Sequence, residues 1–77
     1  MKYVVVRLRG IEIPILFPSY MSHEEASRGH EAVSGGFILL MRLPDGGIEV
    51  KAYGESVSLN LPSRPEDSAL LTTELLR

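Results

Sequence analysis

Two β-branched runs joined by Arg9-Gly10 constrain the fold of this chain more than any other feature. The runs are KYVVVRL (2–8) and IEIPILF (11–17). Glycine at the second position of a two-residue loop supplies the positive φ that a hairpin turn requires, so we predict an antiparallel hairpin. Pro14 has no N–H to donate, which predicts an edge strand or a bulge there. Alternation gives the second strand one apolar face, made of Ile11, Ile13, Ile15 and Phe17.

The second half of the chain predicts three further strands. FILLMRL (37–43) is apolar on nearly both faces, as a central strand would be, and we interpret Ser34-Gly35-Gly36 as the turn that precedes it. IEVKAY (48–53) alternates cleanly after the turn signal Pro44-Asp45-Gly46-Gly47, which predicts a second hairpin. VSLNL (57–61) continues the alternation with Val57, Leu59 and Leu61 facing inward.

Two capping-box patterns predict two helices. Ser22-His23-Glu24-Glu25 predicts a short helix over 23–28 that ends at Gly29. Ser63-Arg64-Pro65-Glu66 predicts a second helix over 64–76, with proline in the first turn. The leucines of this helix spread over a wide arc, so it should be buried on two sides.

These elements predict a single small α+β domain that spans residues 1–77. Its order is strand, strand, helix, three strands and helix, with an antiparallel sheet of about five strands and the C-terminal helix packed on one face.

Length and charge limit the classes of partner. A chain of 77 residues without cysteine buries a small core and has no disulfide, so we expect a homo-oligomer. A net charge of −2, with the basic residues dispersed, disfavours nucleic-acid binding. No apolar run approaches the ~20 residues that cross a bilayer, and MKYVVVRLRG does not resemble a signal peptide, so we expect a soluble cytoplasmic protein with no membrane partner.

The stretch GESVSLNLPSRPEDS (54–68) has two interpretations. In the structural interpretation, which we favour, Ser58 and Asn60 face solvent on a strand while Ser63 and Glu66 cap a helix. In the functional interpretation, hydroxyl groups and an arginine beside a helix N-terminus bind an anionic ligand. We predict that any ligand engages Tyr53, Ser56, Ser58 and Arg64.

The two histidines are the only other candidates for chemistry. His23 and His30, with neighbouring glutamates, have ligand types that suit a divalent metal ion, which keeps a metal-dependent enzyme as an alternative. Their spacing matches no zinc motif, so we favour solvent-exposed loop histidines. The sequence has no cysteine and no G-x-S-x-G elbow, and we therefore predict no catalytic residues, no enzyme activity and no cofactor.

Several segments resemble small accessory proteins of tailed bacteriophages. They are Gly54-Glu55-Ser56-Val57-Ser58-Leu59, Ser63-Arg64-Pro65-Glu66-Asp67-Ser68, the Ile-Pro-Ile-Leu-Phe-Pro run and the Met-Ser-His-Glu-Glu stretch. The resemblance implies a non-enzymatic binding protein in the host cytoplasm that antagonises a host protein or sequesters an anionic small molecule, for example a nucleotide signal of host immunity. A minor structural or assembly component of a phage particle is a second alternative.

Overall fold

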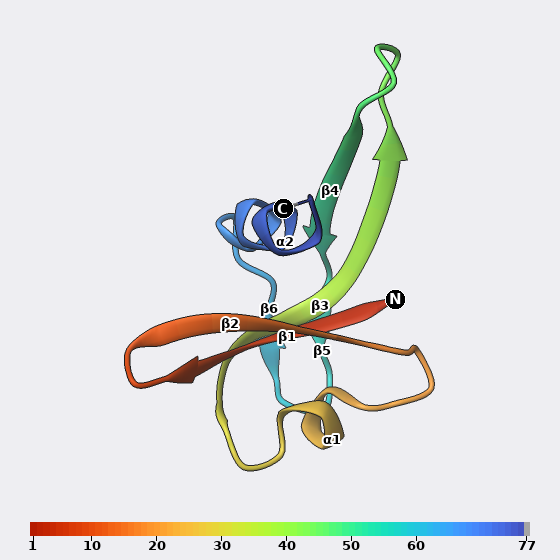
Figure 1. Ribbon diagram of the computed structural model, residues 1–77. Helices are drawn as coiled ribbons and strands as arrows, with labels where there is room; N and C mark the ends of the chain where they lie inside the picture. The colour runs from red at the N-terminus through yellow and green to blue at the C-terminus, as the bar shows by residue number, and fades with distance from the viewer. Residues whose placement is uncertain (77) are drawn as a thin grey trace.

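The computed structural model describes residues 1–76 and shows an α+β domain built on a four-stranded antiparallel sheet (Figure 1). The sheet order is β2-β1-β3-β4, and a separate two-stranded sheet pairs β5 with β6. The elements are β1 (Lys2–Leu8), β2 (Ile11–Phe17), α1 (His23–Ser27), β3 (Glu31–Arg42), β4 (Ile48–Tyr53), β5 (Glu55–Ser56), β6 (Leu61–Pro62) and α2 (Asp67–Leu76). The predicted fold class and C-terminal helix are confirmed, with four strands in the main sheet.

The first hairpin forms as predicted. Arg9 and Gly10 have φ values of 53° and 79°, the left-handed conformation at both loop positions that matches the twist of the two strands. β2 is an edge strand, and Pro14 lies opposite Val5 of β1. The proline therefore removes no hydrogen bond from the centre of the sheet.

β3 begins six residues earlier than predicted, at Glu31, and the turn expected at Ser34-Gly35-Gly36 is wrong. Both glycines lie within the strand because other segments pass very close to them. A Cβ on Gly35 would lie 3.1 Å from the ring of His23 and 3.1 Å from Cβ of Ser56, and one on Gly36 would collide with the Tyr53 carbonyl oxygen. Glycine here permits close approach of chain segments and does not reverse the chain.

The strand expected over 57–61 is also wrong. Residues 57–60 form a turn between β5 and β6, and Val57 is 86% exposed. Asn60 takes a left-handed conformation with φ of 54°, and the Ser56 hydroxyl accepts a hydrogen bond from the Leu59 amide at 3.2 Å. Local hydrogen bonding by Ser and Asn replaces a ladder that the alternating pattern predicted.

The main sheet carries one helix on each face (Figure 1). On the face that we call the α2 face, Leu71 of α2 packs with Tyr3, Val5 and Val50. On the opposite α1 face, the buried core is Val4, Val6 and Phe17, against which Met21, Ala26 and Leu59 pack. The alternation predicted for β2 is kept, but Ile11 and Ile13 at the hairpin tip remain exposed.

The two predicted capping boxes have different outcomes. The first is confirmed, because Ser22 Oγ accepts from the Glu25 amide at 3.0 Å and Glu25 Oε1 accepts from the Ser22 amide at 3.1 Å. The second is wrong, because Ser63 Oγ instead donates to the Gly54 carbonyl oxygen at 2.8 Å, and α2 begins at Asp67. The helix starts three residues later than expected because the Asp67 carboxylate, and not Ser63, collects the hydrogen bonds at this end.

Asp67 is a fully buried carboxylate at the start of α2. The Tyr3 hydroxyl donates to its Oδ2 at 2.6 Å, and the Arg64 backbone amide and Nε donate at 3.0 Å to Oδ2 and Oδ1. The Arg64 guanidinium also donates two hydrogen bonds to Glu12 of β2, at 2.9 and 3.1 Å. One carboxylate thus ties α2 to β1 directly and to β2 through Arg64.

These contacts set the protonation states of the cluster. Burial by itself raises the pKa of the Asp67 carboxyl, but the hydrogen bonds from Tyr3 and from the Arg64 amide outweigh it and hold the pKa below its ordinary value. Burial, reinforced by the hydrogen bond to Asp67, raises the pKa of the Tyr3 hydroxyl. Asp67 is therefore ionised and Tyr3 is neutral when the protein is folded at neutral pH.

We expect Asp67→Ala to lower the free energy of unfolding by about 3–5 kcal/mol, because the buried Tyr3 hydroxyl and part of the Arg64 guanidinium lose their partner. The matched control is Glu66→Ala, which removes an exposed carboxylate next to Asp67 and should change stability by about 0.5 kcal/mol or less. Urea denaturation followed by circular dichroism measures both. Similar losses for the two variants would contradict the role assigned to Asp67.

The lowered pKa of Asp67 also predicts an acid-labile fold. A carboxyl whose pKa is lower in the folded than in the unfolded state contributes stability that is complete above the unfolded value, about 3.9, and is lost as the pH falls through the folded value. The melting temperature of the parent should therefore fall below about pH 4. In Asp67→Asn this fall should be smaller, and an unchanged pH profile would show that Asp67 is not its source.

Candidate functional site

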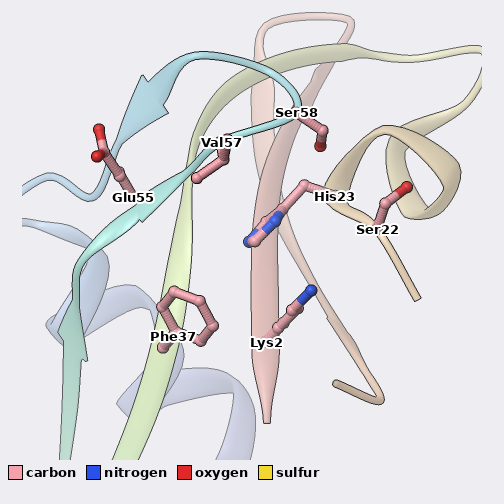
Figure 2. A pocket seen from close by; sticks show the side chains of 7 residues that line it. All are labelled: Lys2, Ser22, His23, Phe37, Glu55, Val57 and Ser58. Carbon is pink, nitrogen blue, oxygen red and sulfur yellow. The ribbon is translucent and has the colours of Figure 1, made fainter. Parts of the chain in front are cut away.

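A pocket of about 270 Å³ opens on the α1 face, where α1, the start of β1, the middle of β3 and the β5–β6 turn meet (Figure 2). We call it the α1 pocket. Its lining residues are Lys2, Ser22, His23, Phe37, Glu55, Val57 and Ser58. They come from segments that are far apart in the sequence, so only the folded chain brings them together.

His23 is the most enclosed polar side chain of the α1 pocket. The capping box at Ser22 makes His23 the first residue of α1, and its ring lies against β3 with 3% of the residue exposed. Nε2 lies 2.9 Å from the Gly36 carbonyl oxygen, so Nε2 carries a proton and donates it. The ring also meets Phe17 and Phe37 edge-on, with centroids 5.1 and 6.0 Å apart. The expectation of a solvent-exposed His23 is wrong.

The other ring nitrogen of His23, Nδ1, lies on the ring edge that is turned away from β3. Cδ2 and Nε2 lie toward Gly35 and Gly36 of β3, so the ring edge that carries Nδ1 faces away from this strand. Nδ1 has no hydrogen-bond partner within residues 1–76. It is not fully enclosed either, because Ser34 Oγ is the only fully buried side-chain polar atom without a partner in that part of the chain. Nδ1 is therefore the ring nitrogen of His23 that is left without a partner and is not completely buried.

Three further side chains offer hydrogen-bond donors to the α1 pocket. The Lys2 ammonium donates one N–H to the Met21 carbonyl oxygen at 3.1 Å and has two more. The Ser22 and Ser58 hydroxyls accept from the amides of Glu25 and Glu24, at 3.0 and 3.2 Å, and each keeps its own proton for donation. Lys2, Ser22 and Ser58 therefore supply charge and donors near His23.

The remaining wall of the α1 pocket is apolar. Phe37 and Val57 lie across from Lys2 and Ser22, and the carboxylate of Glu55 points away from Lys2 and His23 (Figure 2). Phe37 is braced by Tyr53, whose ring centroid lies 5.7 Å away. The exposed Val57 side chain borders the pocket. One side of the pocket thus suits an anion and the other suits an apolar or aromatic group.

The four residues predicted to bind a ligand do not gather on one surface. Ser58 lines the α1 pocket, and Tyr53 lies next to it behind Phe37. Ser56 is fully buried, and its hydroxyl caps the turn that follows. Arg64 lies on the α2 face, where its guanidinium donates hydrogen bonds to Glu12 and Asp67, and the bonds that it donates to Glu12 raise its pKa. The prediction assumed that the strands over 48–53 and 57–61 present their outward side chains in one continuous row, but residues 57–60 form a turn that separates these side chains.

Sequence reasoning missed Lys2, His23 and Phe37 as pocket residues. Two local signals point toward them. Lys2 alternates with Val4 and Val6, which places it on the α1 face, and a histidine directly after a capping serine lies at a helix start close to the preceding strand pair. Neither signal reveals that Phe37 lies opposite, because Phe37 reaches Lys2 only through the pairing of β1 with β3.

His30 is exposed and lies between α1 and β3, apart from the buried ring of His23. Within residues 1–76, no three His, Cys, Asp or Glu side chains are grouped so that they could hold a metal ion. The same part of the chain contains no helix that is long and apolar enough to span a membrane.

No protein-family model, curated protein or solved structure matches this chain. The resemblance to phage accessory proteins therefore stays a prediction, and the geometry of the α1 pocket is the basis for a proposal about function.

The hydrogen bond to Gly36 predicts the tautomer of His23. In long-range ¹H–¹⁵N spectra at alkaline pH, we expect the resonances of His23 to show a protonated Nε2 and an unprotonated Nδ1. The exposed His30 provides an internal comparison. A protonated Nδ1 in His23 would mean that the ring does not donate to β3 and that the pocket is built differently.

Proposed function

We propose that this protein is a non-enzymatic binding protein that captures a small anionic molecule with an aromatic body, such as a nucleotide, in the α1 pocket. The observation that carries the proposal is the two-sided lining of the pocket. Lys2, His23 and two serine hydroxyls lie on one side, and Phe37 with Val57 forms the other. Ligand pockets are commonly apolar cavities with a few placed polar groups that fix orientation.

Each side of the α1 pocket recognises a different part of such a ligand. The Lys2 ammonium, with two N–H groups to spare, forms charge-assisted hydrogen bonds to a carboxylate or phosphate. The Ser22 and Ser58 hydroxyls add neutral donors. Phe37 offers a ring for stacking, and Tyr53 behind it holds that ring in place.

His23 adds selectivity. Because Nε2 donates to Gly36, Nδ1 of the neutral ring is an acceptor and takes a hydrogen bond from a hydroxyl or N–H of the ligand. A ligand that combines an anionic group, an aromatic body and a donor finds a partner in the pocket for each of these features. Nucleotides have all three features.

The hydrogen bonds of the serines support binding without catalysis. Activation of a serine nucleophile requires a base within hydrogen-bond distance of its hydroxyl. In residues 1–76 the hydroxyls of Ser22 and Ser58 are bonded to amides of α1, and the imidazole of His23 is bonded to β3. None of these contacts pairs a nucleophile with a base.

The test is a titration with adenosine monophosphate followed in ¹H–¹⁵N spectra, with adenosine and inorganic phosphate as separate probes. We expect adenosine monophosphate to shift the amide signals around the α1 pocket, and each fragment alone to bind more weakly. Binding confined to another surface, or no binding by any of the three probes at millimolar concentration, would contradict the proposal.

Lys2→Gln should weaken adenosine monophosphate binding about tenfold or more, since a hydrogen bond to a charged group contributes about 1.5–3 kcal/mol. The matched control is Arg42→Gln, which removes one positive charge at an exposed position on the opposite face of β3. Equal effects of the two substitutions would show that the ligand senses only the net charge of the protein.

A further inference from the structure

The β3–β4 hairpin extends well beyond α2 and the rest of the domain (Figure 1). The domain is elongated as a result, with principal extents of 40 × 27 × 18 Å. We call the part of the hairpin over residues 39–51 the arm. Its α1 face is uncovered, since Leu39 is 45% exposed and the charged residues beside it on β4 are exposed as well.

The register of the arm places two apolar and two charged side chains in a square on this face. Phe37 pairs with Lys2, which lies on the α1 face, so Leu39 and Met41 lie on that face too. Across the strand pair, Leu39 is opposite Lys51 and Met41 is opposite Glu49. The square therefore has an apolar column on β3 and a column of two opposite charges on β4.

The two charges of the square have no counterpart within the described part of the chain. Neither Glu49 nor Lys51 forms an ion pair or a side-chain hydrogen bond within residues 1–76. By contrast, Glu12, Arg64 and Asp67 on the other face are all paired. Two charges of opposite sign beside an exposed apolar column fit a partner that presents the same two charges in the reverse order.

We propose that a second copy of this chain docks on the α1 face of the arm. The two arms pack face to face with antiparallel strands, about a two-fold axis that lies between them and perpendicular to the strands. This axis exchanges the two cross-strand pairs, Leu39–Lys51 and Met41–Glu49, and it places β3 on β3 and β4 on β4 of the second copy. Leu39 then meets Met41 of the second copy, and Lys51 meets Glu49 of the second copy, each contact occurring twice.

The other face-to-face arrangement is unfavourable. A two-fold axis parallel to the strands would exchange the columns and place Leu39 against Lys51 of the second copy. An ammonium would then be buried against an apolar side chain without a partner, which costs free energy. The pattern of the arm therefore selects one orientation.

The size of the arm predicts the strength of the dimer. A standard protein interface buries roughly 800 Å² per partner, and four side chains on two strands cover less than this. We therefore expect a reversible dimer whose population rises with protein concentration through the micromolar range, and whose affinity falls as salt screens the two ion pairs.

Charge exchange tests the proposal with sedimentation equilibrium over a dilution series. Lys51→Glu places two glutamates on β4, and Glu49→Lys places two lysines there, so each variant alone should lose dimer affinity about tenfold or more. An equimolar mixture of the two variants should dimerise, because every contact then pairs a glutamate with a lysine. The double variant Glu49→Lys/Lys51→Glu should also recover dimerisation.

Arg28→Glu is the matched control for Lys51→Glu, since it lowers the net charge by the same amount at an exposed position away from the arm. It should leave the dimer affinity within about twofold of the parent at equal salt. Dimer loss equal to that of Lys51→Glu, a mixture that stays monomeric, or a parent that is monomeric up to millimolar concentration would each overturn the proposal. Thermal melts of every variant separate loss of association from loss of folding.

Discussion

The buried carboxylate of Asp67 determines how the rest of the chain is arranged. An ionised group that is taken out of water requires partners from several directions, and here they come from Tyr3 in β1 and from Arg64, which in turn holds Glu12 in β2. These contacts fix the start of α2 over one face of the sheet. The helix then has one orientation in which Leu71 reaches Tyr3, Val5 and Val50. A core this small benefits from a directional anchor that a few aliphatic contacts cannot supply.

The position of α2 also decides what happens on the opposite face. The chain passes from the end of β4, around β3, to Arg64. Residues 55–62, which we call the β5–β6 ribbon, follow this path. Gly35 and Gly36 allow it to run against β3 without steric conflict. The ribbon and the five-residue helix α1 together cover only part of the α1 face. The α1 pocket is the gap that remains between them, and the arm is the part that neither covers.

Much of the fold follows from local sequence, and particular residues show why the rest does not. The Arg9-Gly10 turn and the Ser22 capping box form because the groups that stabilise them are neighbours in the chain. Gly35, Ser63 and Val57 were misinterpreted for one shared reason. The local pattern fits a turn for Gly35, a cap for Ser63 and a strand for Val57. In the fold, Gly35 is constrained by His23, Ser63 bonds to Gly54, and Val57 follows the route of the β5–β6 ribbon. These constraints are distant in the sequence or depend on the tertiary fold. The same holds for the site, since Lys2, His23 and Phe37 converge only after β1 pairs with β3 and α1 docks.

The α1 pocket and the arm lie on the same face of β3 and β4, which connects the two proposals physically. Phe37 lines the pocket, Tyr53 packs on Phe37, and Lys51 of the arm lies two residues before Tyr53 on the same face of β4. A ligand large enough to extend past Phe37 therefore approaches the surface where a second copy docks. If the ligand contacts the second copy, ligand binding raises the affinity of the dimer. Dimerisation then raises the affinity for the ligand by the same factor, because coupling between two binding equilibria is reciprocal. A ligand that fits wholly within the pocket would leave the dimer affinity unchanged, so the dependence of dimerisation on ligand size reports how far the bound molecule extends along β3.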